Sequence, residues 1–173
     1  MLRSTVLAVA LLLVPAAHAE DIFIPQVATA APVARALSLD PPDYSGKAAD
    51  LQLDLATMRE PGRNAGAIVQ SGFLNAATQD VSGIGNAVIQ HQNGTSLTSD
   101  VLVAGRDNGV AVDQEGTGFA SDVIVAGENK LLIHIQRDAA PAVAAMPILL
   151  QGSAEERLLV VDTPYGRLTK PLD

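Results

Sequence analysis

The chain contains no cysteine and no tryptophan, and only 3% of its 173 residues are aromatic. The absence of cysteine excludes a disulfide scaffold, a thiolate zinc site and a cysteine nucleophile. Since 48% of the residues are nevertheless apolar, any core must be built from Val, Ile, Leu and Ala. This composition favours a thin, repetitive β architecture over a bulky globular core.

Basic residues are also scarce. The 11 Lys and Arg residues stand against 19 Asp and Glu, which gives a formal net charge of −8 and an isoelectric point near 4.7. Nucleic acids and anionic lipid surfaces require a basic footprint on the protein. Neither is therefore expected as the main partner.

The first 19 residues have the features of a secretory signal peptide. Arg3 precedes an apolar run over residues 6–17, and the run ends in an A-x-A-like cleavage site before Glu20. A membrane anchor would need about 20 apolar residues, and Pro15 cuts the run short. We therefore expect residues 1–19 to be removed, leaving an exported, acidic protein without a transmembrane segment.

Residues 20–63 are rich in proline and alanine. Prolines interrupt long helices and central strands, and here they stand at Pro25, Pro32, Pro41, Pro42 and Pro61. The stretch is interpreted as a linker or flexible N-terminal arm. Within it, residues 48–58 place Leu51, Leu55 and Met58 at helical spacing, so either a short helix or a fluctuating segment is expected there.

An internal repeat runs from residue 64 to residue 138. Glycine recurs at every eleventh position, at Gly72, Gly83, Gly94, Gly105, Gly116 and Gly127. Amide side chains recur at twice that spacing, at Asn64, Asn86 and Asn108 and at Gln70, Gln92, Gln114 and Gln136, whereas Val81, Val103 and Val125 fill the intervening slots. The heptapeptides 99–105 and 121–127 are nearly identical.

This repeat predicts an all-β fold, a short β-solenoid (β-helix-like) of about 22-residue coils. Each coil consists of two 11-residue units, and each unit offers about six extended residues followed by a turn at the glycine. Residues one coil apart then stack at ~4.8 Å, and stacked amides can hydrogen-bond to the copies above and below. The Asn and Gln columns are therefore predicted to be stacking ladders, and the two end coils remain open edges.

Strand alternation assigns the inward side chains. In the units that carry the Gln column the inward side chains are Val88, Gln90, Val110, Val112, Leu132 and His134. In the units that carry the Val81, Val103 and Val125 column they are Ser99, Val101, Ser121 and Val123. Apolar residues also occur at positions where strand alternation points the side chain away from the core, namely Ile89, Leu102, Ile124, Ile133 and Ile135. Either this outer face packs against another element or molecule, or strands rich in β-branched residues simply expose some of them.

Two further groups of side chains, four aspartates and two histidines, bear on function. Asp80, Asp100, Asp113 and Asp122 lie in or beside the strands, where they are either gatekeepers against self-association or a solvated acidic face. His91 and His134 are the only histidines after the signal peptide, and no ligand or triad spacing accompanies them. No catalytic, metal or cofactor site is therefore predicted.

The repeat is lost in the C-terminal segment, residues 139–173. An Ala/Pro-rich stretch, 139–147, precedes two apolar runs at 148–150 and 158–161. These runs are predicted to form a hairpin across residues 152–157. The hairpin either caps one edge of the solenoid or recognises another secreted component.

The repeat resembles that of the curlin family. Residues 64–77 read NAGAIVQSGFLNAA, in which Asn, a small residue, Ile, Gln, Gly, Asn and Ala recur with curlin spacing, and residues 86–94 and 108–116 match its first half. The second halves differ, with Leu97 and Phe119 in the Asn slot and Val103 and Val125 in the Gln slot, and the last unit has Lys130 and Asp138 in place of Asn and Gly.

The resemblance implies a secreted, curli-type subunit that forms or nucleates extracellular amyloid fibres for adhesion and biofilm matrix. Its partners would be further copies or other curlin-like subunits, and an outer-membrane secretion component. The irregular repeats suggest a minor or nucleating member. The alternative is a non-polymerising β-solenoid at the cell surface that acts as an adhesin or assembly partner.

Overall fold

The computed structural model describes residues 44–137 and 146–172. The predicted signal peptide, residues 20–43 of the predicted arm and Asp138 lie outside these ranges. One helix and ten strands form within them: α2 (Ser45–Met58), β1 (Ala65–Phe73), β2 (Ala76–Ile84), β3 (Ala87–Thr95), β4 (Thr98–Arg106), β5 (Gly109–Thr117), β6 (Ala120–Glu128), β7 (Lys130–Arg137), β8 (Ile148–Gly152), β9 (Glu156–Thr163) and β10 (Gly166–Pro171).

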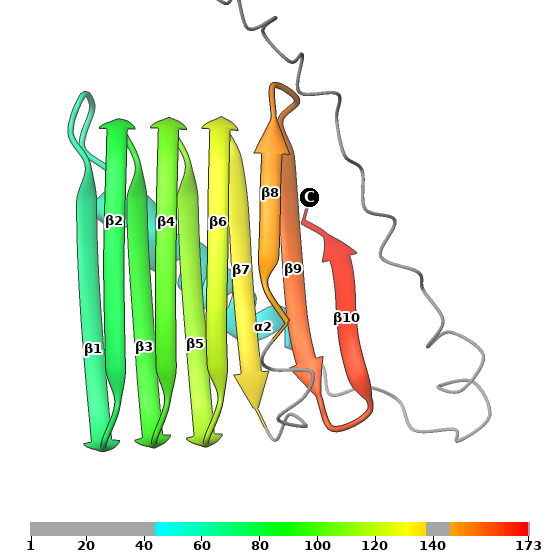
Figure 1. Ribbon diagram of the computed structural model, residues 1–173. Helices are drawn as coiled ribbons and strands as arrows, with labels where there is room; N and C mark the ends of the chain where they lie inside the picture. The colour runs from blue at the N-terminus through cyan, green and yellow to red at the C-terminus, as the bar shows by residue number, and fades with distance from the viewer. Residues whose placement is uncertain (1–43, 138–145, 173) are drawn as a thin grey trace, which may run out of the picture.

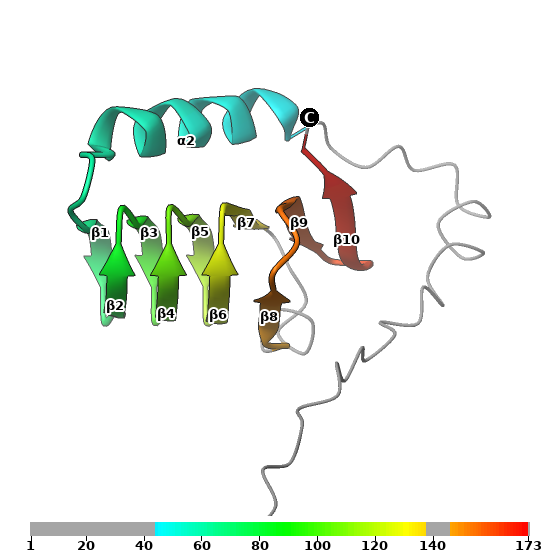
Figure 2. The same cartoon turned by 90° about the horizontal axis from the view of Figure 1, so that it is seen from above.

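The strands form two facing sheets, and successive strands alternate between them (Figures 1 and 2). One sheet has the order β1-β3-β5-β7-β9-β10, here called the odd sheet. The other sheet, here called the even sheet, has the order β2-β4-β6-β8. Of the strands described, β10 is the one even-numbered strand that lies in the odd sheet. The pairing is parallel except between β9 and β10. The predicted β-solenoid of about 22-residue coils is confirmed, and it has about four turns.

The coils stack in register. Gln70 pairs with Gln92 in the neighbouring odd strand, and Val81 pairs with Val103 in the neighbouring even strand. Because the two sheets advance by the same number of positions per coil, equivalent side chains stand directly above one another. The columns expected from the sequence are thereby formed.

The six repeat glycines are each the last residue but one of strands β1 to β6, with φ between 100° and 153°, and the turns that the sequence places at them begin two residues later. Residues with a side chain rarely adopt this conformation. At Gly105 (φ 127°) a Cβ atom would also overlap the carbonyl oxygen of Gly127 in the next coil. Close approach of the stacked backbones therefore requires glycine in this column.

The core between the two sheets is narrow and aliphatic. It is built from buried residues of both sheets, namely Val88, Val110, Leu132 and Val160 with Val101, Val103, Val112, Val123, Val125, Ile148 and Leu150. Gln90, Ser99, Ser121 and His134 are buried among them. The inward assignments made from strand alternation are thus confirmed.

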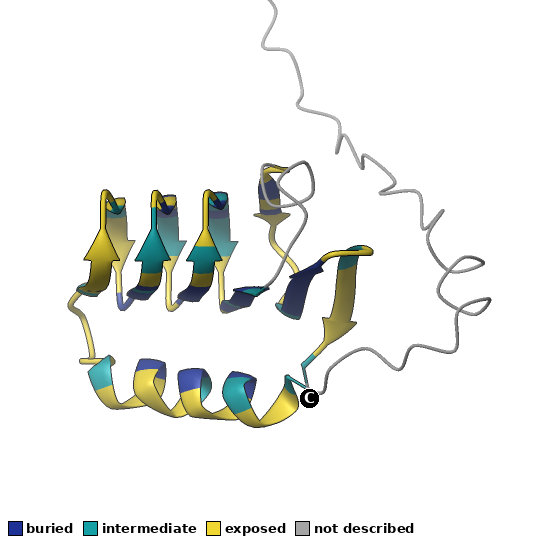
Figure 3. Ribbon diagram, turned by 90° about the horizontal axis from the view of Figure 1, so that it is seen from below, coloured by how far each residue is buried: buried dark blue, intermediate teal, exposed yellow. Residues whose placement is uncertain are grey.

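Helix α2 covers the outer face of the odd sheet (Figures 2 and 3). Ala48, Leu51 and Leu55 occupy one side of the helix and form a second apolar cluster with the sheet residues Ala87, Ile89, Ala111, Ile133, Ile135, Leu159 and Val161. The outward isoleucines of this sheet are therefore partners of the helix. On the even sheet Leu102 remains 40% exposed.

The predicted hairpin between residues 148–150 and 158–161 is wrong. The first run is β8, which pairs with β6, and the second belongs to β9, which pairs with β7. Together they add a fourth coil, and the actual hairpin joins β9 to β10. The repeat disappears from the sequence because this coil is longer: Gln136 pairs with Asp162, 26 positions later.

Within the residues that the structure describes, no helix has the length and apolar character needed to cross a membrane.

Candidate functional site

The two ends of the solenoid differ in their exposure. At the first coil, β1 and β2 are each paired on one side only within the described residues. Their side chains are largely exposed (Figure 3), including Ile68 (43%), Val69 (55%) and Phe73 (67%). An edge of this kind presents unpaired backbone N–H and C=O groups to any further strand.

A continuous glutamine ladder runs inward from this edge. Each Gln Nε2 donates to the Oε1 of the next coil: Gln70 to Gln92 at 2.6 Å, Gln92 to Gln114 at 2.8 Å and Gln114 to Gln136 at 2.6 Å. The three later glutamines are buried, whereas Gln70 is exposed at the open edge. The sequence-predicted column is therefore a directional chain of hydrogen bonds.

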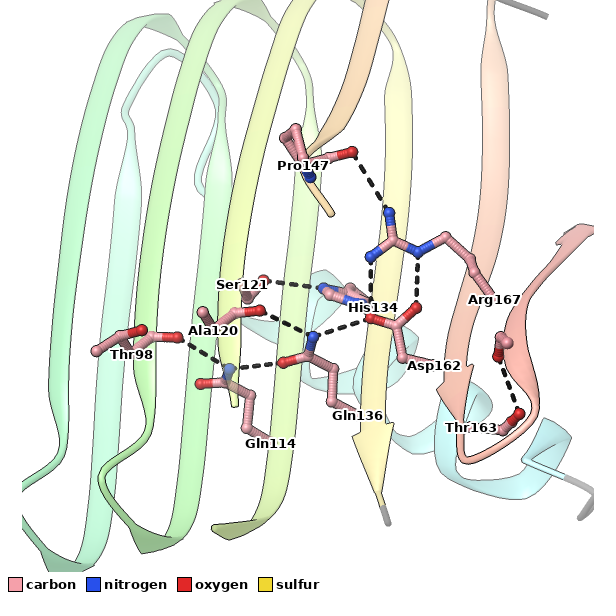
Figure 4. Close-up of polar contacts among 11 residues, drawn as sticks. Thr98, Gln114, Ala120, Ser121, His134, Gln136, Pro147, Asp162, Thr163 and Arg167 are labelled. Atoms are coloured by element: carbon pink, nitrogen blue, oxygen red, sulfur yellow. Dashed lines mark hydrogen bonds and ion pairs between the residues drawn. The ribbon is translucent and has the colours of Figure 1, made fainter. Parts of the chain in front are cut away.

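The same glutamines also tie the two sheets together. Besides the ladder bond, Nε2 of Gln92, Gln114 and Gln136 donates to a backbone carbonyl at the start of an even strand, at Ala76, Thr98 and Ala120 respectively. Figure 4 shows the bonds of Gln114 and Gln136. Both N–H groups of these buried amides thus have acceptors. A buried amide without partners would cost about 1–3 kcal/mol.

The asparagine ladder lies at the opposite end of the odd strands. Oδ1 of Asn64 accepts from both the backbone N–H and Nδ2 of Asn86, and Oδ1 of Asn86 accepts in the same way from Asn108. Here the later coil donates to the earlier one. The two ladders therefore point in opposite directions along the stack.

Both ladders end on charged side chains in the last coils. Asp162 occupies the glutamine column and accepts from Gln136 Nε2 at 2.9 Å. Arg167 of β10 holds both carboxylate oxygens, through Nε at 2.6 Å and through Nη2 at 2.9 Å (Figure 4). Together Asp162, Arg167 and His134 form what we call the polar cap.

The asparagine column ends on Lys130. Its backbone N–H donates to Asn108 Oδ1, and its side chain is only 1% exposed. Nζ donates to the carbonyl oxygen of Ala154 and lies 3.8 Å from a carboxylate oxygen of Glu156. The ammonium group thus replaces the amide and anchors the loop that leads into β9.

The polar cap has a defined protonation state. The pKa of Asp162 falls to about 2, because its hydrogen bonds to Arg167, and then to His134 and Gln136, outweigh burial, which by itself would raise the pKa. Burial lowers the pKa of His134 below 6.5, despite its hydrogen bond to Asp162. Asp162 is therefore ionised and balanced by Arg167, while His134 is neutral.

His134 also links Asp162 to Ser121. His134 Nε2 donates to Asp162 Oδ2 at 2.8 Å, so the neutral ring accepts at Nδ1 from the Ser121 hydroxyl at 2.9 Å (Figure 4). This is the connectivity of a Ser-His-Asp relay, which the sequence did not reveal. Ser121 is 3% exposed, and His134 and Asp162 are fully buried, so a substrate cannot reach the hydroxyl. The hydrogen bonds among the three side chains therefore stabilise the core.

The four predicted gatekeeper aspartates have different environments. Asp80, Asp100 and Asp122 are exposed on the even sheet, where Asp100 and Asp122 are paired neighbours. Asp113 is buried on the odd sheet and forms ion pairs with Lys47 of α2 and with Arg137. Asp113 therefore joins the helix to the sheet. No group of three or more metal-ligating side chains occurs within the described ranges.

Sequence reasoning missed the polar cap because it treated residues 139–173 as lying outside the repeat. A signal was present: residues 158–162 (LLVVD) resemble residues 132–136 (LIHIQ) once a four-residue insertion is allowed. That alignment places an aspartate in the glutamine column.

Comparisons with known proteins return no matching family model, no similar curated protein and no similar solved structure.

Proposed function

We propose that this chain is a secreted structural subunit of a curli-like extracellular fibre and that it takes part in forming or nucleating that fibre at the cell surface. The observation that carries the proposal is the pair of amide ladders running through parallel, in-register coils to an open edge at Asn64 and Gln70. Stacking of identical strands with amide ladders is the physical basis of cross-β fibres.

The open edge supports docking of another chain. A further parallel coil would continue the pairing of β1 and β2, extend both ladders and cover the exposed Ile68, Val69 and Phe73. The backbone groups of this edge would then gain partners of the kind that they have elsewhere in the solenoid.

A second candidate function is a non-polymerising surface protein, an adhesin or an assembly partner. The observation that favours it is the covered C-terminal end of the odd sheet, where β10 runs antiparallel to β9 and no parallel coil follows within the described residues. Such a chain would bind at one end without propagating a stack.

Fractionation of the producing cells distinguishes the two functions. If the chain is a fibre subunit, it should be found in extracellular material that resists sodium dodecyl sulfate and gives a meridional diffraction spacing of about 4.7–4.8 Å. Immunogold labelling with an antibody to the chain should decorate these fibres. Recovery of the chain only from detergent-soluble surface fractions would refute the fibre proposal and favour the second candidate.

A further inference from the structure

The polar cap gives the glutamine ladder a fixed direction. The ionised carboxylate of Asp162 can only accept hydrogen bonds, so Gln136 must turn Nε2 toward it and Oε1 toward Gln114. Gln114 must then offer Nε2 to Gln136, and the same requirement passes to each earlier glutamine. The amide orientations are therefore set by the chemistry of the last coil.

This direction determines what the open edge presents. Gln70 donates Nε2 to Gln92, so its Oε1 faces outward as an acceptor. In the asparagine ladder each later residue donates to the Oδ1 of the earlier one, so Asn64 leaves its backbone N–H and one Nδ2 hydrogen at the edge, while the other Nδ2 hydrogen is donated to the Gly83 carbonyl at 3.0 Å. The edge thus displays an acceptor at Gln70 and donors at Asn64.

Only one kind of coil face fits this display. It must offer a glutamine Nε2 to Gln70 and an asparagine Oδ1 to Asn64, which are the groups that every internal coil turns toward the coil following it in the chain. Two open edges of this chain related by a two-fold axis would instead pair antiparallel, with the Gln70 end of one copy against the Asn64 end of the other, and would not continue the parallel Gln-to-Gln and Asn-to-Asn stacking. The open edge is therefore continued in register only by a coil face of the opposite kind.

The other end of the same chain does not offer those groups either. Gln136 Nε2 already donates to Asp162, and both carboxylate oxygens of Asp162 accept from Arg167. In the asparagine column, Lys130 stands where the next asparagine would be. β10 also covers β9 in the antiparallel sense. A second copy therefore cannot continue the ladders from the C-terminal end.

We infer that the chain docks, through the open edge at β1 and β2, onto the C-terminal face of a parallel β-solenoid of a different chain, one that exposes an unpaired glutamine Nε2 and asparagine Oδ1. The inference rests on the proposed function and adds to it the partner's chemistry and the position of this chain. Because its far end is closed, the chain terminates the stack that it joins.

The test uses the chain without its predicted signal peptide and a fluorescein-labelled synthetic peptide that copies residues 86–107, the sequence of one coil, which forms its strands by adding to the open edge. Fluorescence anisotropy should show saturable binding of the peptide to the wild-type chain. The same peptide with Gln92→Glu loses the Nε2 donor and should bind at least tenfold more weakly.

Two matched variants each add one positive charge to β1, at neighbouring positions. Gln70→Lys can still donate to Gln92 but offers no acceptor at the edge, and it should weaken peptide binding at least tenfold. Ser71→Lys places the same charge on the next residue of β1, whose side chain lies on the strand face away from the core. This variant should bind the peptide as the wild type does. Circular dichroism checks that both variants remain folded.

Sedimentation velocity of the wild-type chain alone completes the test, and it should show a monomer. Absence of peptide binding, or equal binding by Gln70→Lys, would overturn the inference. So would a wild-type dimer or a head-to-tail polymer, since the occupant would then be a second copy. A polymer would leave the fibre proposal standing, whereas absence of the chain from extracellular fibres would refute that proposal whatever the peptide does.

Discussion

The substitution Arg167→Met removes the guanidinium from the polar cap but keeps a side chain of similar length. In the wild type the Arg167 side chain is 6% exposed and Asp162 is fully buried, so the carboxylate would lose the cation that holds both of its oxygens without gaining water. Removing one partner of a buried ion pair typically costs about 3–5 kcal/mol. We expect the free energy of unfolding at pH 7 to fall by about that amount.

A second substitution in the same background separates charge from packing. Asp162→Asn with Arg167→Met removes both charges of the pair, and the Asn Oδ1 can still accept from Gln136 or His134. The double variant should therefore regain at least half of the lost stability. Urea denaturation followed by circular dichroism measures all the variants.

The pH dependence gives an independent check with a definite sign. In the wild type the Asp162 pKa drops from 3.8 to about 2, so it contributes about 2 kcal/mol that is present above pH 3.8 and lost as the pH falls toward 2. Without Arg167 the pKa of Asp162 rises, and the deficit of Arg167→Met relative to wild type should shrink on acidification. A deficit that is constant from pH 7 to pH 3, or a double variant no more stable than Arg167→Met, would refute the reasoning.

Three further predictions concern the ladder, the helix and the acidic surface. Gln114→Leu should lower the free energy of unfolding by about 1–3 kcal/mol in urea titrations, because Gln92 loses its Oε1 acceptor and Gln136 its Nε2 donor; unchanged stability would argue against the ladder. Leu51→Ala should cost about 2–5 kcal/mol, whereas Leu53→Ala, at a residue that is 65% exposed, should cost less than about 0.5; equal losses would show that α2 does not pack as described. Asp100→Asn with Asp122→Asn should raise the fraction of chain that pellets as aggregate after prolonged incubation at pH 7, above that of the monomeric wild type, because the paired like charges of adjacent strands are removed. An unchanged fraction would leave these aspartates as ordinary solvated surface.

The period of the sequence determined the solenoid. Glycine at every eleventh position and amides at twice that spacing define coil length and register without knowledge of any long-range contact, because each coil pairs only with its neighbours. The positions of Gln92 and Gln114 in a buried column follow from strand alternation alone. The same local information left either a short helix or a fluctuating segment over residues 48–58, and the structure has the helix α2 there.

The covering of the odd sheet was decided by the tertiary structure. Outward residues such as Ile89 and Ile133 have no partner that the repeat can specify, because α2 lies before the solenoid and makes no contribution to its period. Only the folded chain shows that Leu51 and Leu55 bury them, while Leu102 on the even sheet stays exposed. Strand alternation shows on which face of the sheet a side chain lies, but it does not show which element packs against that face.

The closed end was likewise decided by the tertiary structure. An insertion of a few residues between β7 and β9 removes the period from the sequence, although the strands still pair in parallel. Asp162 then enters the glutamine column, and Arg167 reaches it only because β10 folds back antiparallel onto β9. A buried carboxylate requires its counter-charge in contact, and that contact depends on the hairpin and not on any repeat in the sequence.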